Sequence, residues 1–400
     1  MNRRRSSRLT IKLSDRVQRV KPSPTLAVTA RAAELKAAGQ DIIGLGAGEP
    51  DFDTPQHIKD AAVNAISNGM TKYTAVDGTT SLKLAVINKF KRDNGLDYTP
   101  EQILVSCGGK QSFYNLAQAL LNEGDEVIIP APYWVSYPDM VLLADATPVI
   151  INTDIKQNFK ISAEQLEAAI TPKTRLFVIN SPSNPSGMAY SASELKGLAS
   201  VLAKYPNVLI ATDDMYEHIL WSEESFSNIV MTNPELYDRS IVLNGVSKAY
   251  SMTGWRIGYA AGPAELIKSM KKIQSQSTSN PTSISQAAAE AALNGDQSCV
   301  TTMLESFKKR HDMVVESLNK IEGIHCLQGD GTFYAFADFS GFMQRFEHIK
   351  NDIELAEFII EKTGVALVPG SAFGNEGYMR LSFATSEENL TEAIKRISSL

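Results

Sequence analysis

Between residues 100 and 262 the chain alternates short apolar runs with segments of helical character, and this alternation limits the folds that it can adopt. The runs are rich in valine and isoleucine and are uninterrupted, as in strands that are covered on both faces. We expect strands at 103–106, 126–130, 147–151, 175–180, 208–213, 241–244 and 257–261. Helices between consecutive strands predict a largely parallel α/β sheet, which binds ligands beyond the carboxyl ends of its strands.

Capping signals support the helices between these strands. Ser162 with Gln165, and Ser191 with Glu194, have the spacing of capping boxes, in which two side chains satisfy free backbone N–H groups at a helix start. We therefore expect helices that begin directly after Ser162 and Ser191.

The pattern changes after Pro281. Amphipathic helices are expected at 283–294 and 300–320, strands near 333–338, 365–368 and 378–384, and a closing helix from about 386. This order is typical of an α+β unit, and 400 residues are too many for one small core. We expect an N-terminal arm at 1–48 that packs on the C-terminal domain, a large domain at 49–299 and a small domain at 300–400.

Composition excludes several classes of protein. The net charge of −6 gives no indication of nucleic-acid binding, and no apolar run approaches the ~20 residues of a membrane-spanning helix. Cys107, Cys299 and Cys326 form no CxxC pair or disulfide framework, so we expect a reducing compartment, the cytoplasm. The first fourteen residues are basic but lack an apolar core for secretion, which favours a basic tail over a targeting signal.

Two glycine-rich motifs suggest nucleotide binding and fail on their spacing. GLGAGEPDFDTP at 44–55 reads GxGxG, with Glu49 where a dinucleotide-binding motif needs its third glycine. SCGGKQ at 106–111 resembles the end of a P-loop but has Leu104 in place of the first glycine and Gln111 in place of Ser or Thr. The five histidines show neither HExxH nor a Cys/His cluster, so we expect no metal site.

Polar residues at the ends of the expected strands form one coherent set. GGK at 108–110 opens a helix, whose N-terminus favours a phosphate. A loop with two prolines at 180–187 displays Asn184, and Asp213 ends the next strand. Each residue alone is typical of a turn, a helix cap or a solvated surface. With Lys248 they supply what pyridoxal phosphate needs: a Schiff-base lysine, an acid for the pyridine nitrogen, donors for the 3′-oxygen and a phosphate cup.

The sequence resembles the class I aminotransferases of fold type I along nearly its whole length, from 14–23 to 380–390. The resemblance is carried by KPSPT, AGEPDFDTP, GGKQ, PAPYWVSYP, NSPSNPSG, YEH and MTGWRIGY, and GVSKAYSMTGWRIG at 245–258 fits the family's pyridoxal-lysine signature. It looks most like the bacterial aspartate aminotransferases grouped with prephenate aminotransferases. The resemblance implies the α/β fold of the fold-type I pyridoxal-phosphate transferases, with a large domain on a mostly parallel sheet and a smaller α+β domain.

The resemblance assigns roles around the cofactor ring. Lys248 would form the Schiff base with pyridoxal 5′-phosphate and then move a proton between Cα and C4′ as general base and acid. Asp213 would keep the pyridine nitrogen protonated, and Trp134 would lie on the ring face. Asn184 and Tyr216 would hydrogen-bond the 3′-oxygen.

The phosphate would be held by Arg256, by Ser247 and by backbone donors at Gly109 and Lys110. Tyr73 matches the tyrosine that reaches the phosphate of the neighbouring subunit, which makes a homodimer with shared active sites the expected active form. An ordinary packed tyrosine is the alternative for Tyr73.

Substrate residues also follow from the resemblance. Arg380 would grip the α-carboxylate by a bidentate pair, beside the Gly48 backbone, Trp134 and Asn184. Other aspartate aminotransferases use a partner-subunit arginine for the distal carboxylate, but the corresponding stretch at 275–283 has none.

In this subgroup the distal carboxylate would instead meet Lys110, Ser23 and Thr25. A solvated surface lysine is the alternative interpretation of Lys110. The expected reaction is ping-pong transfer of the amino group between L-aspartate and 2-oxoglutarate. Prephenate fits the same residues as acceptor, and transamination of aromatic amino acids or alanine, or β-elimination, stays open. A transcription regulator is disfavoured, because only about twenty residues precede KPSPT.

Overall fold

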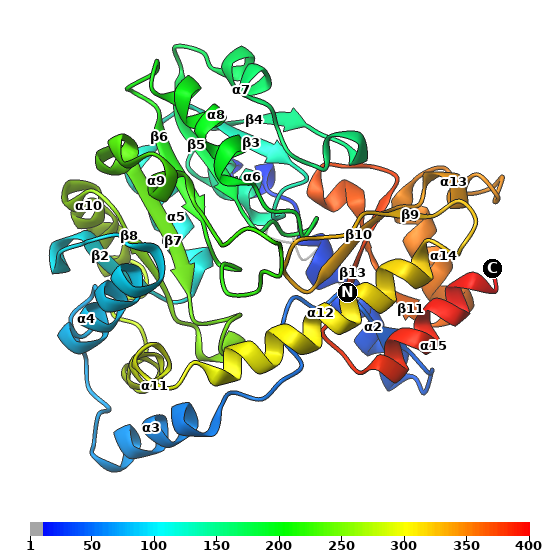
Figure 1. Cartoon of the computed structure of the whole chain (residues 1–400), viewed down its shortest axis with the longest axis horizontal. Coiled ribbons are helices and arrows are strands. Elements are labelled where there is room, and N and C mark those ends of the chain that lie inside the picture. The colour runs from blue at the N-terminus through cyan, green and yellow to red at the C-terminus, as the bar shows by residue number, and fades with distance from the viewer. Residues whose placement is uncertain (1–10) are drawn as a thin grey trace, which may run out of the picture.

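A seven-stranded sheet forms the centre of the larger part of the molecule in the computed structural model, which describes residues 11–400 (Figure 1). The strand order is β2-β8-β7-β6-β5-β3-β4. All neighbours are parallel except β8, which runs antiparallel to β2 and β7. The strands are β2 (Ile103–Ser106), β3 (Glu126–Ala131), β4 (Thr147–Asn152), β5 (Thr174–Asn180), β6 (Leu209–Asp213), β7 (Ser240–Gly245) and β8 (Gly258–Ala261). The predicted, largely parallel α/β sheet is confirmed.

Helices cover both faces of this sheet, since successive strand residues point to opposite faces and both faces are apolar. One face packs against α3 (Gln56–Ser67), α4 (Thr80–Lys89), α7 (Ala163–Ala169), α8 (Ala192–Leu202), α9 (Ile229–Thr232) and α11 (Ser283–Asn294). The other face packs against α5 (Gly109–Leu120), α6 (Ser136–Leu143) and α10 (Ala264–Ser275). The capping boxes predicted at Ser162 and Ser191 open α7 and α8. Short 3-10 or π segments lie at 90–94, 100–102, 155–157, 234–239, 253–255 and 370–373.

A four-stranded antiparallel sheet of order β12-β13-β10-β9 lies in the smaller part, as the predicted α+β pattern requires. Its strands are β9 (His325–Cys326), β10 (Tyr334–Asp338), β12 (Val368–Pro369) and β13 (Tyr378–Ser382). Its helices are α12 (Ser298–Leu318), α13 (Ser340–Met343), α14 (Asp352–Thr363) and α15 (Glu387–Ser398). The long helix α12 runs from beside α11 to this sheet, so one rigid element joins the two parts (Figure 1).

The N-terminal segment returns to the smaller part. It contains α1 (Asp15–Arg19), α2 (Pro24–Ala37) and β1 (Ile43–Gly44), and β1 pairs in parallel with β11 (Val365–Ala366). Apolar residues of α2 pack on this pair, and Arg16 and Arg19 of α1 form ion pairs with Asp145 after α6. The division of the chain at residues 48 and 299 stays a prediction, and most of the basic N-terminal stretch lies outside the described residues.

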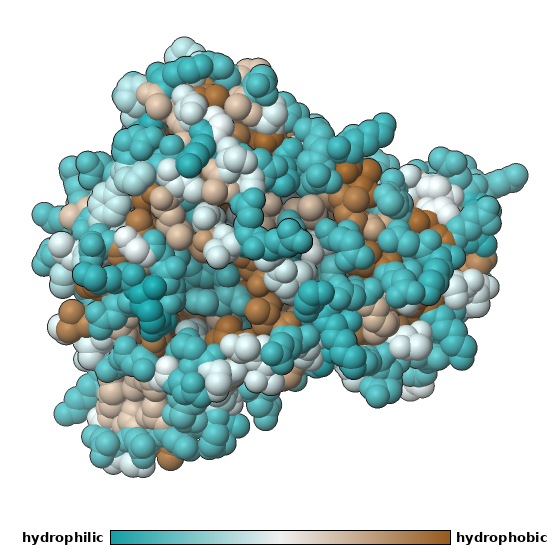
Figure 2. Space-filling model, viewed as in Figure 1, coloured by the Kyte–Doolittle hydropathy of each residue, from teal (hydrophilic) through white to brown (hydrophobic). Residues whose placement is uncertain are grey.

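Hydrophilic residues dominate the face shown in Figure 2, and its hydrophobic residues lie in separate patches. Within residues 11–400 no helix is long and apolar enough to cross a membrane. Cys107, Cys299 and Cys326 are free thiols. The cytoplasmic location stays a prediction.

Candidate active site

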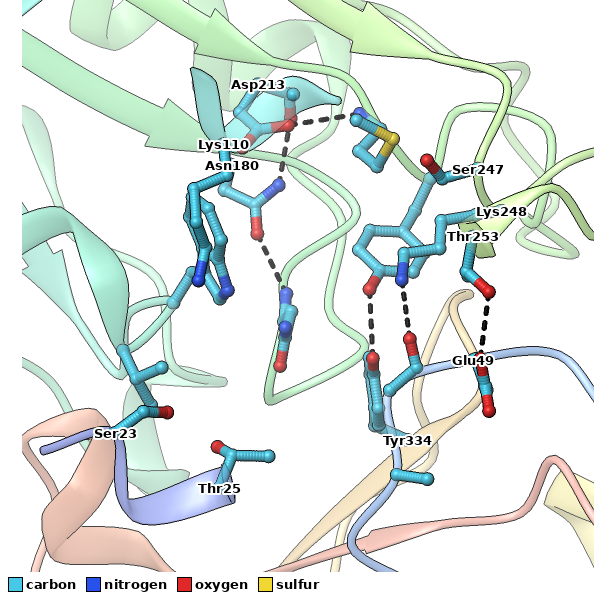
Figure 3. A pocket seen from close by; sticks show the side chains of 18 of the residues that line it. Ser23, Thr25, Glu49, Lys110, Asn180, Asp213, Ser247, Lys248, Thr253 and Tyr334 are labelled. Carbon is cyan, nitrogen blue, oxygen red and sulfur yellow. Dashed lines mark hydrogen bonds between the residues drawn. The ribbon is translucent and has the colours of Figure 1, made fainter. Parts of the chain in front are cut away.

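A cavity of about 440 Å³ lies beyond the carboxyl ends of β5, β6 and β7, where α/β sheets bind ligands. Side chains from the N-terminal segment, the large sheet and the small sheet line it, and Figure 3 shows Ser23 and Thr25 across the cavity from Ser247 and Lys248. The predicted site residues that line it are Ser23, Thr25, Gly48, Gly109, Lys110, Trp134, Asn184, Asp213, Tyr216, Ser247, Lys248, Arg256 and Arg380. Tyr73 does not, since it lies elsewhere on the surface and is 92% exposed.

Lys248 follows β7 and turns its amine into the cavity, where Nζ donates to the carbonyl oxygen of Gly48 at 2.5 Å. Burial lowers the pKa of this lysine to about 8, and the positive charges of Arg380 and Arg256 act in the same direction. An amine with a lowered pKa is neutral in a larger fraction of molecules near neutral pH, and only the neutral amine is a nucleophile. Lys248 is therefore suited to attack a carbonyl carbon.

Asp213 ends β6 on the floor of the cavity. Burial raises the pKa of its carboxyl group, while hydrogen bonds from the Tyr137 hydroxyl and the Met215 N–H, together with the charge of Lys248, oppose the rise. Asn180 at the end of β5 donates to the backbone oxygen of Asp213 at 2.9 Å. The carboxylate is thus held in one orientation and would gain most from a cationic partner in the cavity.

Arg380 presents a buried guanidinium that has no carboxylate partner among residues 11–400. Nη1 donates to Asn184 Oδ1 at 2.9 Å and Nη2 donates to the Gly46 oxygen at 2.8 Å, whereas the buried Nε has no partner. The side chain is 2% exposed, and burial lowers its pKa. A buried cation held only by neutral groups is costly, so this geometry indicates a site for an anionic group.

A second anion site lies at the start of α5, which has no side-chain cap. Gly108 has φ +85°, and a Cβ there would lie 2.3 Å from Nη2 of Arg256, so only glycine allows the guanidinium to lie against the helix start. Arg256 donates to the Thr253 oxygen at 2.8 Å. Free N–H groups beside a guanidinium favour a phosphate.

Lys110 is exposed on its side of the cavity, and its ammonium lies 5.3 Å from the centroid of the Trp134 ring. Partial burial and the charge of Arg256 lower its pKa. The ammonium therefore faces the cavity across an aromatic ring rather than pointing freely into solvent.

The polar residues that were not predicted as site residues include Glu49, Asn180 and Tyr334, which line the cavity, and Tyr137, which contacts Asp213. Glu49 accepts a hydrogen bond from the Thr253 hydroxyl at 2.8 Å. Glu49, Asn180 and Tyr137 lie inside the motifs AGEPDFDTP, NSPSNPSG and PAPYWVSYP, whose presence could have drawn attention to them. Tyr334, in GTFYAF, carries no such signal.

Comparison with known proteins places the chain in a family. The family model of the class I and II aminotransferases matches residues 40–397, so the chain belongs to this family. It is 64% identical over 395 residues to the aspartate/prephenate aminotransferase of Nitrosomonas europaea, covering 98% of this chain and 100% of that protein. It is 56% identical to the enzyme of that name from Cereibacter sphaeroides, covering 96% and 97%.

Solved structures of aspartate aminotransferases have the same fold as this chain. The aspartate aminotransferase of Rhizobium meliloti superposes with a TM-score of 0.94 at 49% identity, covering 98% of both chains. The aspartate aminotransferase of Thermus thermophilus with maleate superposes with a TM-score of 0.91 at 42% identity, covering 98% of this chain and 100% of that one. The predicted family and fold type are confirmed.

A buried ion pair lies behind the cavity, next to Tyr216 in the chain. Lys89 of α4 is fully buried, pairs with Glu217 and donates to Asn94 Oδ1 at 2.7 Å. Asn94 and Asn244 each donate to Glu217 at 2.8 Å. Although burial raises the pKa of Glu217, the charge of Lys89 holds it below its ordinary value. Both charges are thus compensated inside the protein.

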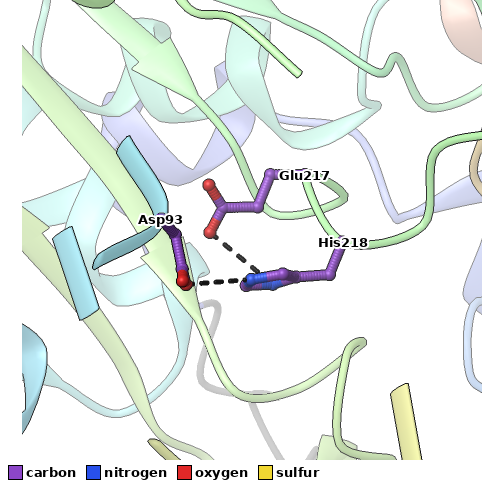
Figure 4. A group of neighbouring side chains, drawn as sticks. All are labelled: Asp93, Glu217 and His218. Carbon is purple, nitrogen blue, oxygen red and sulfur yellow. Dashed lines mark hydrogen bonds and ion pairs between the residues drawn. The ribbon is translucent and has the colours of Figure 1, made fainter. Parts of the chain in front are cut away.

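Asp93 and His218 stand beside this pair (Figure 4). The possible ligand atoms of Asp93, Glu217 and His218 lie within 4.8 Å of one another, close enough to hold a metal ion. However, the Lys89 ammonium contacts Glu217 and lies 4.0 Å from Asp93. A cation of the protein itself therefore already occupies this group, and we assign no metal to it.

Replacing Lys89 tests this interpretation. Lys89→Met should lower the free energy of unfolding by about 3–5 kcal/mol, because it leaves Glu217 buried without its counter-ion. Lys91→Met is the control, since Lys91 and its partner Asp97 are 71% and 79% exposed and the loss should stay below about 1 kcal/mol. Equilibrium urea unfolding measures both, and equal losses would contradict the assignment.

Proposed function

We propose that this chain is a pyridoxal-phosphate-dependent aminotransferase that moves the amino group of L-aspartate to 2-oxoglutarate, giving oxaloacetate and L-glutamate. The observation that carries the proposal is that one cavity holds Lys248, with its lowered pKa, together with Asp213. The same cavity also holds two groups that favour anions, one at Arg380 and one at Arg256 beside the start of α5. The names of relatives that are 64% and 56% identical support the choice of aspartate.

The residues fit pyridoxal 5′-phosphate. Lys110, Lys248, Arg256 and Arg380 give the cavity four cationic side chains against two acidic ones, Glu49 and Asp213. That excess and the partnerless Nε of Arg380 suit a dianionic phosphate at one end and a substrate carboxylate at the other. When bound, the cofactor supplies an electron sink for the charge that develops at the substrate Cα.

Each side chain near the ring has a distinct task. Arg256, Ser247 and the α5 backbone at Gly109 and Lys110 hold the phosphate. Asp213 holds the proton on the pyridine nitrogen, because a carboxylate fixed by Tyr137 prefers a cationic neighbour.

Trp134 shields one ring face. Asn184 and Tyr216, which also line the cavity, donate to the 3′-oxygen.

Lys248 performs the proton transfer. With the cofactor and substrate bound, its free and neutral amine would take the proton from the substrate Cα and deliver it to C4′ of the cofactor. Since one lysine serves the donor and the acceptor in turn, the first product leaves before the second substrate binds, which gives ping-pong kinetics.

The substrate is held at both ends. Arg380 and Asn184 bind the α-carboxylate beside Gly48. Lys110, Ser23 and Thr25 meet the distal carboxylate on the other side of the cavity, and the buried Thr25 hydroxyl has no partner of its own. A buried hydroxyl without a partner is expected to acquire one from a ligand.

Prephenate is a second candidate acceptor. The relatives that share 64% and 56% of their residues with this chain carry prephenate in their names. Its side chain also ends in a carboxylate, so the residues that bind the distal group of aspartate would serve it.

The active form is a homodimer in this proposal. Tyr73 is 92% exposed, and Val63 (58%) and Ile66 (54%) of α3, the helix that precedes it in the chain, are exposed as well. A second copy of the chain would cover them and receive Tyr73 at its phosphate site.

The activity is tested by incubating purified holoenzyme with aspartate and either 2-oxoglutarate or prephenate and following oxaloacetate. We expect parallel double-reciprocal lines with 2-oxoglutarate, and no multiple turnover for Lys248→Ala. Without an acceptor we expect at most one oxaloacetate per active site, so repeated turnover under that condition, or intersecting lines, would contradict the mechanism. Comparing kcat/KM for the two acceptors decides between them.

Substrate selection rests on Lys110. Lys110→Ala should lower kcat/KM for aspartate by about 10- to 100-fold, because a hydrogen bond to a charged group contributes roughly 1.5–3 kcal/mol. An apolar amino donor of similar size provides the control, and its kcat/KM should change little. Equal losses for both donors would mean that Lys110 supports the cofactor or the fold.

Subunit exchange tests the shared site. Mixing inactive Lys248→Ala with inactive Tyr73→Ala subunits should restore some activity, because each heterodimer has one site with both lesions and one with neither. Exchange is verified by mass spectrometry of tagged subunits. Verified heterodimers without activity would place Tyr73 outside the neighbour's site.

A further inference from the structure

Tyr334 joins two groups of the cavity that belong to different sheets. It starts β10, is 1% exposed and pairs with Ser382 of β13. Its ring lies over Arg380, with 4.3 Å between the ring centroid and Cζ, and its hydroxyl lies 3.0 Å from the Tyr216 hydroxyl. Figure 3 shows this hydrogen bond beside Lys248.

Packing does not explain the hydroxyl of Tyr334. A phenylalanine would stack on Arg380 with the same ring face. Gly48 nevertheless leaves room for the hydroxyl, because a residue with a Cβ at that position would place the Cβ only 2.8 Å from the hydroxyl oxygen. The position is therefore built to accommodate an oxygen that reaches Tyr216.

Two hydroxyls joined by one hydrogen bond must divide their roles. One donates, and the other accepts and keeps its own proton for a further acceptor. Burial raises the pKa of both phenols, so both are protonated at neutral pH. Arg380 opposes the rise in both pKa values, but it contacts the Tyr334 ring directly, whereas the charge of Asp213 raises the pKa of Tyr216 further. These charges favour Tyr334 as the donor and Tyr216 as the acceptor.

We propose that Tyr334 is a positioning residue that donates to Tyr216 and so directs the Tyr216 O–H at the 3′-oxygen of the cofactor. This inference rests on the proposed function. Because a hydroxyl that accepts a hydrogen bond becomes a stronger donor, Tyr334 also strengthens the bond that Tyr216 makes.

The pH titration of the visible absorbance of the holoenzyme tests the proposal. A donor at the 3′-oxygen stabilises its anionic form, which lowers the pKa of the proton between that oxygen and the Lys248 nitrogen. Tyr334→Phe keeps the ring and should raise the apparent pKa by about 0.4 to 1, the effect of losing one hydrogen bond. Tyr216→Phe should raise it at least as much, and adding Tyr334→Phe to that variant should change nothing further.

Steady-state kinetics give a second readout. Tyr334→Phe should lower kcat for aspartate by about 2- to 10-fold. It should leave KM within about twofold, because the ring still covers Arg380. Tyr334→Leu removes the ring as well and should raise KM by about 2- to 30-fold.

Tyr190→Phe is the matched control, because it removes another buried hydroxyl, one that accepts from the Ile161 N–H at 2.9 Å. It should titrate like the unmodified protein. The proposal would be overturned if the Tyr334→Phe holoenzyme had the same apparent pKa as the unmodified protein. It would also be overturned if the pKa shifts of Tyr334→Phe and Tyr216→Phe added in the double variant. A protein that gains no visible absorbance with pyridoxal phosphate would instead refute the proposed function.

Discussion

Positive charge without a matching carboxylate is the constraint around which the cavity is organised. Arg380 is buried against neutral oxygens, Arg256 lies against the uncapped start of α5, and both depress the pKa of Lys248. Neutral partners orient these cations without cancelling them. The cavity thus holds an excess of positive charge, which would accommodate anionic groups. Burial is the main reason that the Lys248 amine is partly neutral near neutral pH, and the same positive excess acts in the same direction.

The parallel sheet explains how residues far apart in sequence supply this set. The ends of β5, β6 and β7 meet at one edge, which brings together Asn180, Asp213 and the loop of Lys248. Loops at such an edge accept polar residues because no helix covers them, while the strands behind them stay apolar on both faces. The small sheet then adds Arg380 and Tyr334 from neighbouring strands β13 and β10. The lining of the cavity therefore depends on how the two sheets are placed relative to each other.

The sequence predicted the sheet well because uninterrupted Val/Ile runs leave few alternatives for a buried strand. It left the direction of β8 open, since antiparallel and parallel buried strands share the same apolar pattern. Thirteen of the fourteen predicted site residues line the cavity, and most of them lie in the motifs that carry the family resemblance. Tyr334 was missed for a physical reason: its partners are 118 and 46 positions away, and its neighbours in sequence are ordinary core residues. Tyr137 lies inside the motif PAPYWVSYP, but only the fold shows that its hydroxyl contacts Asp213.

The buried ion pair of Lys89 and Glu217 supports the residues that line the cavity. Glu217 follows Tyr216 directly, and Asn244, which donates to Glu217, precedes the loop of Lys248. The chain segments of two cavity-lining residues, Tyr216 and Lys248, are therefore anchored on one buried carboxylate. Because Lys89 compensates that carboxylate, the anchor adds rigidity without adding negative charge behind the cavity. An uncompensated carboxylate there would favour the protonated form of Lys248 and offset the effect of the two arginines.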